Sequence, residues 1–245
     1  MKIFVVNLER AAERRVAILR HLAELGLEAE ILPAVEGARV DRASLGPDAE
    51  PGLSNGEVGC YLSHVRFWQT VVERRLPHAI ILEDDVICSP TLMRVADEIA
   101  ALDLPWDAVR LSALQPIRGI PLLTLSGGER LILPNKHPSG TQAYMVSLAG
   151  ARRLLDAIAV PKGPIDDTLD RYWRFGLCVP VLSPSVVVED ASLASSIAGR
   201  FGSDGGNSIP RRVARHFARV AEAERRKIAV FLMARRLRAH LHKAD

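Results

Sequence analysis

The stretch Ala79-Ile80-Ile81-Leu82-Glu83-Asp84-Asp85 is the most informative part of this sequence. Its first four residues form a short apolar run, which is typical of a buried strand. The run ends in three adjacent carboxylates, whose mutual repulsion a bound cation would offset. Because ligands bind outside the carboxyl ends of strands in open α/β sheets, the run predicts a Mg²⁺ or Mn²⁺ site there. The alternative is a solvated loop that begins with acids.

Strands and helices alternate on both sides of this run. Residues 2–6 and 28–33 have the profile of strands, and a helix with apolar residues at helical spacing separates them. Ser54 and Glu57 fit a capping box that opens a second helix. Further strands are expected at 107–112, near 130–133, and at 142–146, 178–182 and 186–188, with helices after Ser89, Ser147 and Pro164. The alternation predicts an α/β fold with an open, mostly parallel central sheet.

The composition is that of a globular protein, but its charge is unevenly distributed. Residues 210–245 carry 11 Lys+Arg against 3 Asp+Glu, whereas residues 1–209 carry 21 against 26. We therefore expect a body over 1–209 and a basic tail over 210–245. Three cysteines far apart form neither a zinc cage nor a disulfide framework, which favours a cytoplasmic protein. No stretch approaches the roughly 20 apolar residues of a membrane span.

Two more acidic groups and one histidine are candidates for a site. In a helix, Asp166 and Asp170 share a face while Asp167 points elsewhere; acids in a first helical turn are also ordinary partners of the helix dipole. Glu189-Asp190 follows the last expected strand and is a weaker candidate. His64 lies on the helix opened by Ser54, where a lone histidine is more often structural than functional.

Several classes of protein lack support in the sequence. No G-x-G-x-x-G follows the first strand, and neither a Walker-type lysine motif nor a G-x-S-x-G elbow is present. The body is acidic and carries no recognised nucleic-acid motif, so no nucleic-acid partner is expected.

Five segments together resemble glycosyltransferase family 25, which includes bacterial lipooligosaccharide galactosyltransferases and collagen galactosyltransferases. They match the family in order over roughly residues 3–170. Ser195-Ser196-Ile197 resembles a short late element. The five segments are Val5-Val6-Asn7-Leu8-Glu9-Arg10 with Arg14-Arg15, Ala34-Val35-Glu36-Gly37, Gly56-Glu57-Val58-Gly59-Cys60 with Ser63-His64, Leu82-Glu83-Asp84-Asp85, and Gly140-Thr141 with Tyr144 and Ser147. A sixth, shorter match is Pro164-Ile165-Asp166, which resembles the Pro-Val-Asp element of the family.

The resemblance implies a GT-A-like fold, a UDP-sugar donor, a divalent metal and inversion at the anomeric carbon. It implies a hexosyltransferase, with galactose the expected sugar and lipooligosaccharide or another glycan the acceptor. The alternative is a non-catalytic member that binds a sugar or a partner. The expected roles are metal binding for Asp84 and Asp85, general base for Asp166 with Asp170 in reserve, and substrate binding for Asn7, Arg10, His64, Glu83 and Tyr144.

The basic tail predicts an amphipathic helix, broken into two pieces. Its apolar residues mostly recur at three- and four-residue spacings, and arginines fill much of the rest. One alternative is that the helix packs its apolar stripe on the body. The other is attachment to an anionic membrane, which would place the protein at the cytoplasmic face of the inner membrane and near a lipid-linked acceptor. The apolar residues are Val213, Phe217, Val220, Ile228, Phe231, Leu232 and Leu241.

Overall fold

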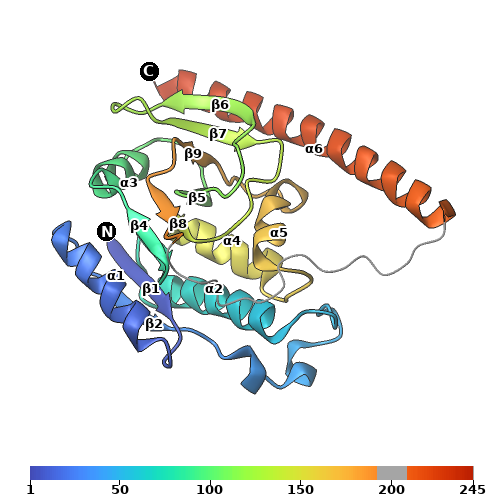
Figure 1. Cartoon of the computed structure of the whole chain (residues 1–245). Helices are drawn as coiled ribbons and strands as arrows, with labels where there is room; N and C mark the ends of the chain where they lie inside the picture. Colours follow the sequence, from blue (N-terminus) through green and yellow to red (C-terminus); the bar gives the residue numbers. More distant parts are fainter. Residues whose placement is uncertain (192–208, 245) are drawn as a thin grey trace.

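An eight-stranded sheet forms the centre of the protein in the computed structural model (Figure 1). The structure describes residues 1–191 and 209–244, and within the last helix it describes side chains from 220 to 241. The family-like element at 195–197 and the side chains of Val213 and Phe217 therefore lie outside the described residues. The strand order is β2-β1-β3-β8-β5-β9-β7-β6, and a separate two-stranded sheet pairs β10 with β4.

The bounds of the elements follow the predicted alternation closely. The strands are β1 Lys2–Asn7, β2 Glu30–Pro33, β3 His78–Glu83, β4 Val86–Cys88, β5 Ala108–Arg110, β6 Gly119–Thr124, β7 Arg130–Pro134, β8 Ala143–Ser147, β9 Val181–Ser183 and β10 Val187–Glu189. The α-helices are α1 Ala12–Glu24, α2 Asn55–Glu73, α3 Leu92–Ala100, α4 Leu148–Ile158, α5 Ile165–Asp170 and α6 Ile209–Ala244. Short 3₁₀ turns are η1 Gly37–Arg39, η2 Arg42–Leu45 and η3 Tyr172–Phe175.

The direction of the strands confirms the predicted sheet. β1 pairs in parallel with both β2 and β3, and β5 pairs in parallel with β9. β8 lies antiparallel between β3 and β5, and β7 lies antiparallel between β9 and β6. Six of the eight strands thus run in one direction. The carboxyl ends of β1, β2 and β3 consequently meet at one edge of the sheet.

Helix α2 fixes this edge from one face of the sheet. Its capping box is present as predicted, because Glu57 N donates to Ser54 Oγ at 3.2 Å and Ser54 N donates to Glu57 Oε2 at 2.7 Å. Its buried side packs Phe67 and Trp68 into the core, and Figure 1 shows α4 beside α2. The start of α2 is therefore held firmly next to the ends of the parallel strands.

Residues 115–140 form a hairpin of two strands, β6 and β7, where a single short strand is predicted. The prediction of one strand is wrong. It missed β6, because β6 contains Pro121 and a proline argues against a strand. Proline lacks the N–H that a central strand needs, but β6 is the edge strand of the sheet and tolerates it. The register also shifts between Pro121 and Leu123.

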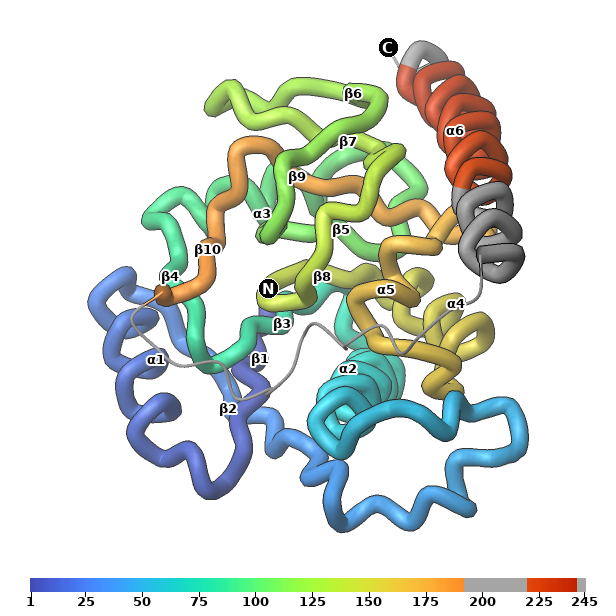
Figure 2. The backbone as a smooth tube through the Cα atoms, turned by 45° about the vertical axis from the view of Figure 1, so that its right-hand side comes forward, coloured from blue at the N-terminus to red at the C-terminus, as the bar shows by residue number. Residues whose placement is uncertain are grey.

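The basic tail forms one continuous helix, α6, rather than two pieces. Pro210 lies in its first turn, where a missing N–H costs little, and neither Gly nor Pro follows. Val230, Ala234 and Leu237 are buried against the body, and α6 contacts β6, β7 and η3. Figure 2 shows α6 on the opposite side of the molecule from α1. No helix among the described residues is long and apolar enough to cross a membrane.

Candidate active site

A pocket lies where β1, β2 and β3 end and α2 begins. Lining residues come from β1, β3 and α2 and from the loop that follows β2, and they include Asn55, Gly56 and Glu36. Two glycines bring the loop after β2 against α2. A Cβ on Gly59 would lie 2.5 Å from the carbonyl oxygen of Val35, and one on Gly37 would overlap the carbonyl oxygen of Asn55. The pocket therefore depends on backbone contact that no larger residue permits.

The three carboxylates that end β3 all line this pocket. Asn7 Nδ2 donates to Asp84 Oδ2 at 2.6 Å and to the carbonyl oxygen of Ala11 at 3.0 Å. The guanidinium of Arg14 pairs with Asp84 at 2.9 Å and also with Asp85. Burial raises the pKa of Asp84, and the hydrogen bond from Asn7 and the charge of Arg14 oppose that rise. Arg14 thus offsets the repulsion between the carboxylates. From the sequence alone, a bound cation was expected to do this.

Two buried oxygens in this region could accept a cation. Asn7 Oδ1 and Asp85 Oδ1 are buried, and neither has a hydrogen-bond partner among the described residues. Oxygen atoms of this kind are what Mg²⁺ and Mn²⁺ take as ligands. The backbone N–H of Asp190 donates to the carbonyl oxygen of Asp85 at 2.8 Å, which brings the weaker acidic candidate Glu189-Asp190 beside the first cluster. The donor set fits a hard divalent cation.

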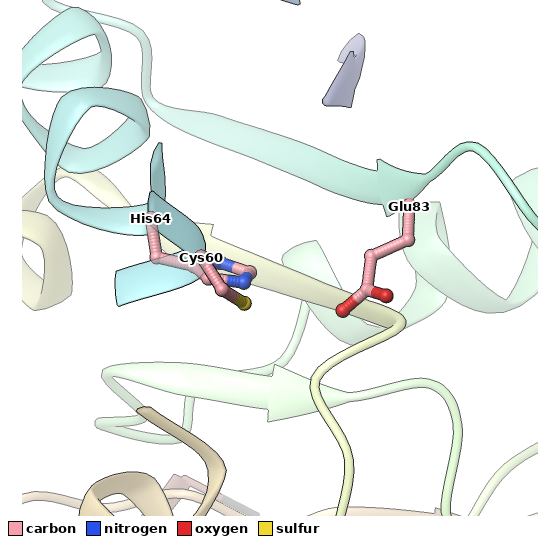
Figure 3. Close-up of side chains that lie close together, drawn as sticks. All are labelled: Cys60, His64 and Glu83. Atoms are coloured by element: carbon pink, nitrogen blue, oxygen red, sulfur yellow. The ribbon is translucent and has the colours of Figure 1, made fainter. Parts of the chain in front are cut away.

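Cys60, His64 and Glu83 form a second cluster in the same pocket (Figure 3). The cysteine sulfur, a histidine ring nitrogen and a carboxylate oxygen lie within 4.8 Å of one another. The sequence predicts site roles for His64 and Glu83, and the structure brings the two residues together. Cys60 is not predicted as a site residue, although it precedes His64 by one helical turn and so shares its face.

Behind His64 lies a buried polar network. His64 Nδ1 and Tyr144 Oη are 3.0 Å apart, and Trp68 Nε1 donates to the same oxygen at 2.9 Å. Burial lowers the pKa of His64 to about 4, against the opposing charge of Asp166. Tyr144 is fully buried and does not line the pocket. Tyr144 contacts His64, which does line the pocket, and its predicted substrate contact stays a prediction.

The other predicted substrate contact, Arg10, does line the pocket. Its guanidinium is largely exposed and pairs with Glu36 at 3.3 Å. That pair links the loop after β1 to the loop after β2, and both of its residues line the pocket.

The two candidate bases have different surroundings. Asp170 is buried, pairs with the buried Arg110 and accepts a hydrogen bond from Ser139 N at 3.1 Å. Burial raises its pKa, while the charge of Arg110 opposes the rise. Asp166 is half-buried at the start of α5, near enough to act on the pKa of His64. Asp170 thus holds an internal ion pair, whereas Asp166 is outside the pocket lining and accepts a hydrogen bond from Asp167 N at 2.9 Å.

The sequence of the chain matches known proteins in its N-terminal part. Residues 1–115 match the model of glycosyltransferase family 25, described as an LPS biosynthesis protein. The resemblance to family 25 is confirmed. The chain is 32% identical over 192 residues to a probable inactive glycosyltransferase 25 family member 3 of Bos taurus, covering 69% of this chain and 31% of that protein. It is 29% identical over 190 residues to procollagen galactosyltransferase 2 of Homo sapiens, covering 69% and 29%.

The chain thus spans about a third of the length of the family 25 relatives it matches. Solved structures with a similar arrangement include a glycosyltransferase involved in glycosylation of the major capsid of PBCV-1, at 10% identity and a TM-score of 0.45, covering 79% of this chain and 93% of that one. A galactosyltransferase LgtC in complex with donor and acceptor sugar analogs matches at 12% identity and a TM-score of 0.41, covering 73% of each chain.

Proposed function

We propose that the protein is a GT-A-like, inverting glycosyltransferase that moves a hexose, with galactose expected, from a UDP-sugar to a lipooligosaccharide or other glycan. The observation that carries the proposal is the pocket at the carboxyl ends of three parallel strands, where open α/β sheets bind nucleotides. The start of α2 borders the same pocket. Helix N-termini attract phosphate groups, so this end of α2 suits the diphosphate of the donor.

The carboxylates after β3 suit a divalent cation, Mn²⁺ or Mg²⁺. Asp84 and Asp85 would hold it together with the unpartnered Oδ1 of Asn7, and Arg14 would share the two carboxylates. When bound, the cation would neutralise charge that develops on the departing UDP. Arg14 adds a fixed positive charge beside the same carboxylates, and Arg10 lies at the mouth of the pocket, within reach of an anionic donor.

Asp166 is our candidate for the general base. Inversion requires a carboxylate that removes the acceptor hydroxyl proton on the face of the sugar opposite the leaving group. Asp166 belongs to α5, which contacts α2, and its charge acts on His64, whereas the donor carboxylates Asp84 and Asp85 follow β3. Asp170 is less suited to the role, because its charge already compensates that of Arg110 inside the protein.

The second candidate function is binding without catalysis. Two observations favour it. The named relatives of this chain include proteins called inactive, and Arg14 stabilises the carboxylate cluster without any metal. In that case the pocket would bind a sugar nucleotide or a partner but release no product.

Nucleotide release distinguishes the two functions. The full chain is incubated with a panel of UDP- and GDP-sugars, with and without Mn²⁺, and free nucleotide is measured, first alone and then with simple glycosides as acceptors. We expect UDP release from a UDP-hexose that requires the metal and stops with EDTA. Donor binding without release under every condition would support the binder and contradict the enzyme.

The acceptor we propose is lipid-linked, because the outer face of α6 suits an anionic membrane. Ile228, Phe231 and Leu232 are 61%, 58% and 48% exposed on that face. Exposed basic side chains flank them at Arg225, Lys227, Arg235 and Arg236. An exposed apolar stripe bordered by cations is typical of helices that lie in the membrane interface. Attachment at the cytoplasmic face of the inner membrane would confine the enzyme and its acceptor to one plane.

A further inference from the structure

Hydrogen bonding behind the pocket fixes the proton positions of three buried side chains. The indole N–H of Trp68 can only donate, so Tyr144 Oη accepts that bond at 2.9 Å. The tyrosine hydroxyl then has its own proton to donate. Among the described residues its other partner is His64 Nδ1, 3.0 Å away, which must therefore accept.

A histidine that accepts at Nδ1 and is neutral carries its proton at Nε2. His64 is neutral at pH 7, because burial lowers its pKa to about 4. None of the described residues hydrogen-bonds Nε2, and His64 lines the pocket. The network of Trp68 and Tyr144 therefore makes His64 a donor toward the pocket and not a base.

Glu83 provides an acceptor facing this donor. Its carboxylate is half-buried at the end of β3, and Thr141 Oγ1 donates to Oε1 at 3.2 Å. A ring nitrogen of His64 and a carboxylate oxygen of Glu83 lie within 4.8 Å of each other (Figure 3). Consider one hydroxyl oxygen that makes two hydrogen bonds of about 2.8 Å, at an angle of about 109° to 120° to each other. The two partner atoms are then about 4.6 to 4.9 Å apart. Because 4.8 Å is the upper limit of their separation, the two side chains are close enough for both to reach one oxygen atom.

We propose that His64 and Glu83 together bind one hydroxyl group of the sugar nucleotide, with His64 Nε2–H donating to the hydroxyl oxygen and the hydroxyl donating to Glu83. This inference rests on the proposed function, because it deepens the same pocket. Tyr144 and Trp68 are positioning residues that hold His64 in the donating tautomer. Because Tyr144 is fully buried, it acts through His64 and touches no substrate.

A transition metal bound by Cys60, His64 and Glu83 is the competing occupant. Zn²⁺ accepts such a set of sulfur, nitrogen and oxygen ligands. A metal at Nε2 would require the other tautomer, in which Nδ1–H donates to Tyr144. The hydroxyl of Tyr144 would then accept two bonds, and its proton would have no acceptor among the described residues.

Nitrogen NMR of the full chain tests the tautomer directly. Histidines are labelled with ¹⁵N, and the signals of His64 are assigned by their loss in His64→Gln. We expect an Nε2–H tautomer at pH 7 that Zn²⁺ leaves unchanged. An Nδ1–H tautomer, a charged ring, or a His64 signal that shifts with Zn²⁺ would overturn the proposal.

Calorimetry with UDP and UDP-hexoses tests the hydroxyl. His64→Gln, which keeps an N–H near the position of Nε2, should bind within about threefold of the wild type, whereas His64→Leu should bind about tenfold more weakly. A deoxy analogue that lacks the bound hydroxyl should lose about tenfold on the wild type and almost nothing on His64→Leu. Ribose 2′- and 3′-deoxy-UDP and deoxyhexose donors identify which hydroxyl it is.

Tyr61→Phe is the matched control, because Tyr61 is a buried tyrosine of α2 whose hydroxyl donates to the carbonyl oxygen of Ile158 at 2.7 Å. It should bind UDP as the wild type does. Equal binding by the wild type and His64→Leu would refute the hydroxyl site and leave the proposed function standing. A wild type that binds neither UDP nor any UDP-hexose would refute the proposed function itself, and the hydroxyl site with it.

Discussion

At the scale of single residues, Arg14 alters what a substitution in the acidic cluster would do. Its guanidinium pairs with both Asp84 and Asp85, so these carboxylates already have a positive neighbour before any metal binds. Removing one negative charge therefore changes both the affinity of the cluster for a cation and the position of Arg14.

We predict that Asp85→Asn retains the fold and lowers turnover at least about 10²-fold, because a neutral amide is a poor ligand and no longer pairs with Arg14. UDP release with saturating Mn²⁺ measures the effect. Asp48→Asn is the control, since Asp48 pairs with Lys162 at 3.0 Å on the surface outside the pocket. Full wild-type activity in EDTA would contradict a metal role for the cluster.

Asp166 and Asp170 should respond differently to the same substitution. Asp166→Asn should lower kcat at least about 10²-fold with little change in donor KM, the scale of general-base loss. Asp170→Asn leaves Arg110 buried without its partner and should lower the free energy of unfolding by about 3 to 5 kcal/mol. Urea titrations and initial rates separate these effects. A stable Asp170→Asn protein without turnover, beside an active Asp166→Asn, would move the base to Asp170.

His64 should make the protein less stable in acid. Its folded pKa, about 4, lies below the unfolded value of 6.5, so the unfolded state binds the proton more readily between these values. The free energy of unfolding then falls as the pH drops through 6.5. The contribution of His64 to this fall ends near pH 4. From pH 7.5 to 5 the loss is about 2 kcal/mol. Burial also lowers the pKa of His78 and His137, so urea unfolding at both pH values should show a loss that is about 2 kcal/mol smaller in His64→Gln than in the wild type.

At the scale of elements, the contact between α2 and the loop after β2 shapes the pocket. A Cβ at position 59 would lie 2.5 Å from the carbonyl oxygen of Val35, so any side chain in place of Gly59 would push the loop away. Two segments that are far apart in the sequence are held together by this contact.

We predict that Gly59→Ala lowers the free energy of unfolding by about 1 to 3 kcal/mol, the usual cost of overpacking, and weakens UDP binding. Thermal unfolding and calorimetry measure the two effects. Gly163→Ala is the matched control, because the nearest atom to its new Cβ would be Thr168 Oγ1 at 4.0 Å. Normal UDP binding by Gly59→Ala would show that the loop is not needed to form the site.

At the scale of the whole molecule, α6 has two faces with different partners. Val230, Ala234 and Leu237 pack on the body, and the salt bridges of Arg171 and Arg174 with Glu222 join the helix to the segment that follows Asp166. Deleting the helix would therefore expose part of the body. Substitutions on the outer face are the better test of membrane binding.

We predict that the full chain sediments with anionic vesicles and that Ile228→Ser, Phe231→Ser and Leu232→Ser together abolish this binding. Each basic residue near the surface should contribute about 1 kcal/mol, so high salt should weaken the binding. A variant with Ile87→Ser and Val188→Ser, which removes two exposed apolar side chains far from α6 in sequence, is the control. Equal sedimentation of all three proteins would exclude the outer face of α6 as the anchor.

Most elements and the position of the acidic cluster could be predicted from the amino-acid sequence. Apolar periodicity and capping are local properties, so the strand that ends at Glu83 and the capping box of Ser54 could be predicted from neighbouring residues. The mostly parallel sheet could also be predicted, because strands that alternate with helices are typical of parallel sheets.

Which side chains meet is a property of the folded chain alone. The partner of Asp170 is Arg110, 60 residues away, and the partner of His64 is Tyr144, 80 residues away. A pattern of neighbouring residues cannot predict these pairs, because they form only when β8 is inserted between β3 and β5. The same holds for Pro121, whose strand is possible only at the edge of the sheet. Charge compensation and burial are properties of the packed molecule, and they distinguish Asp170, which is buried and paired with Arg110, from the half-buried Asp166, whose role as the base stays a prediction.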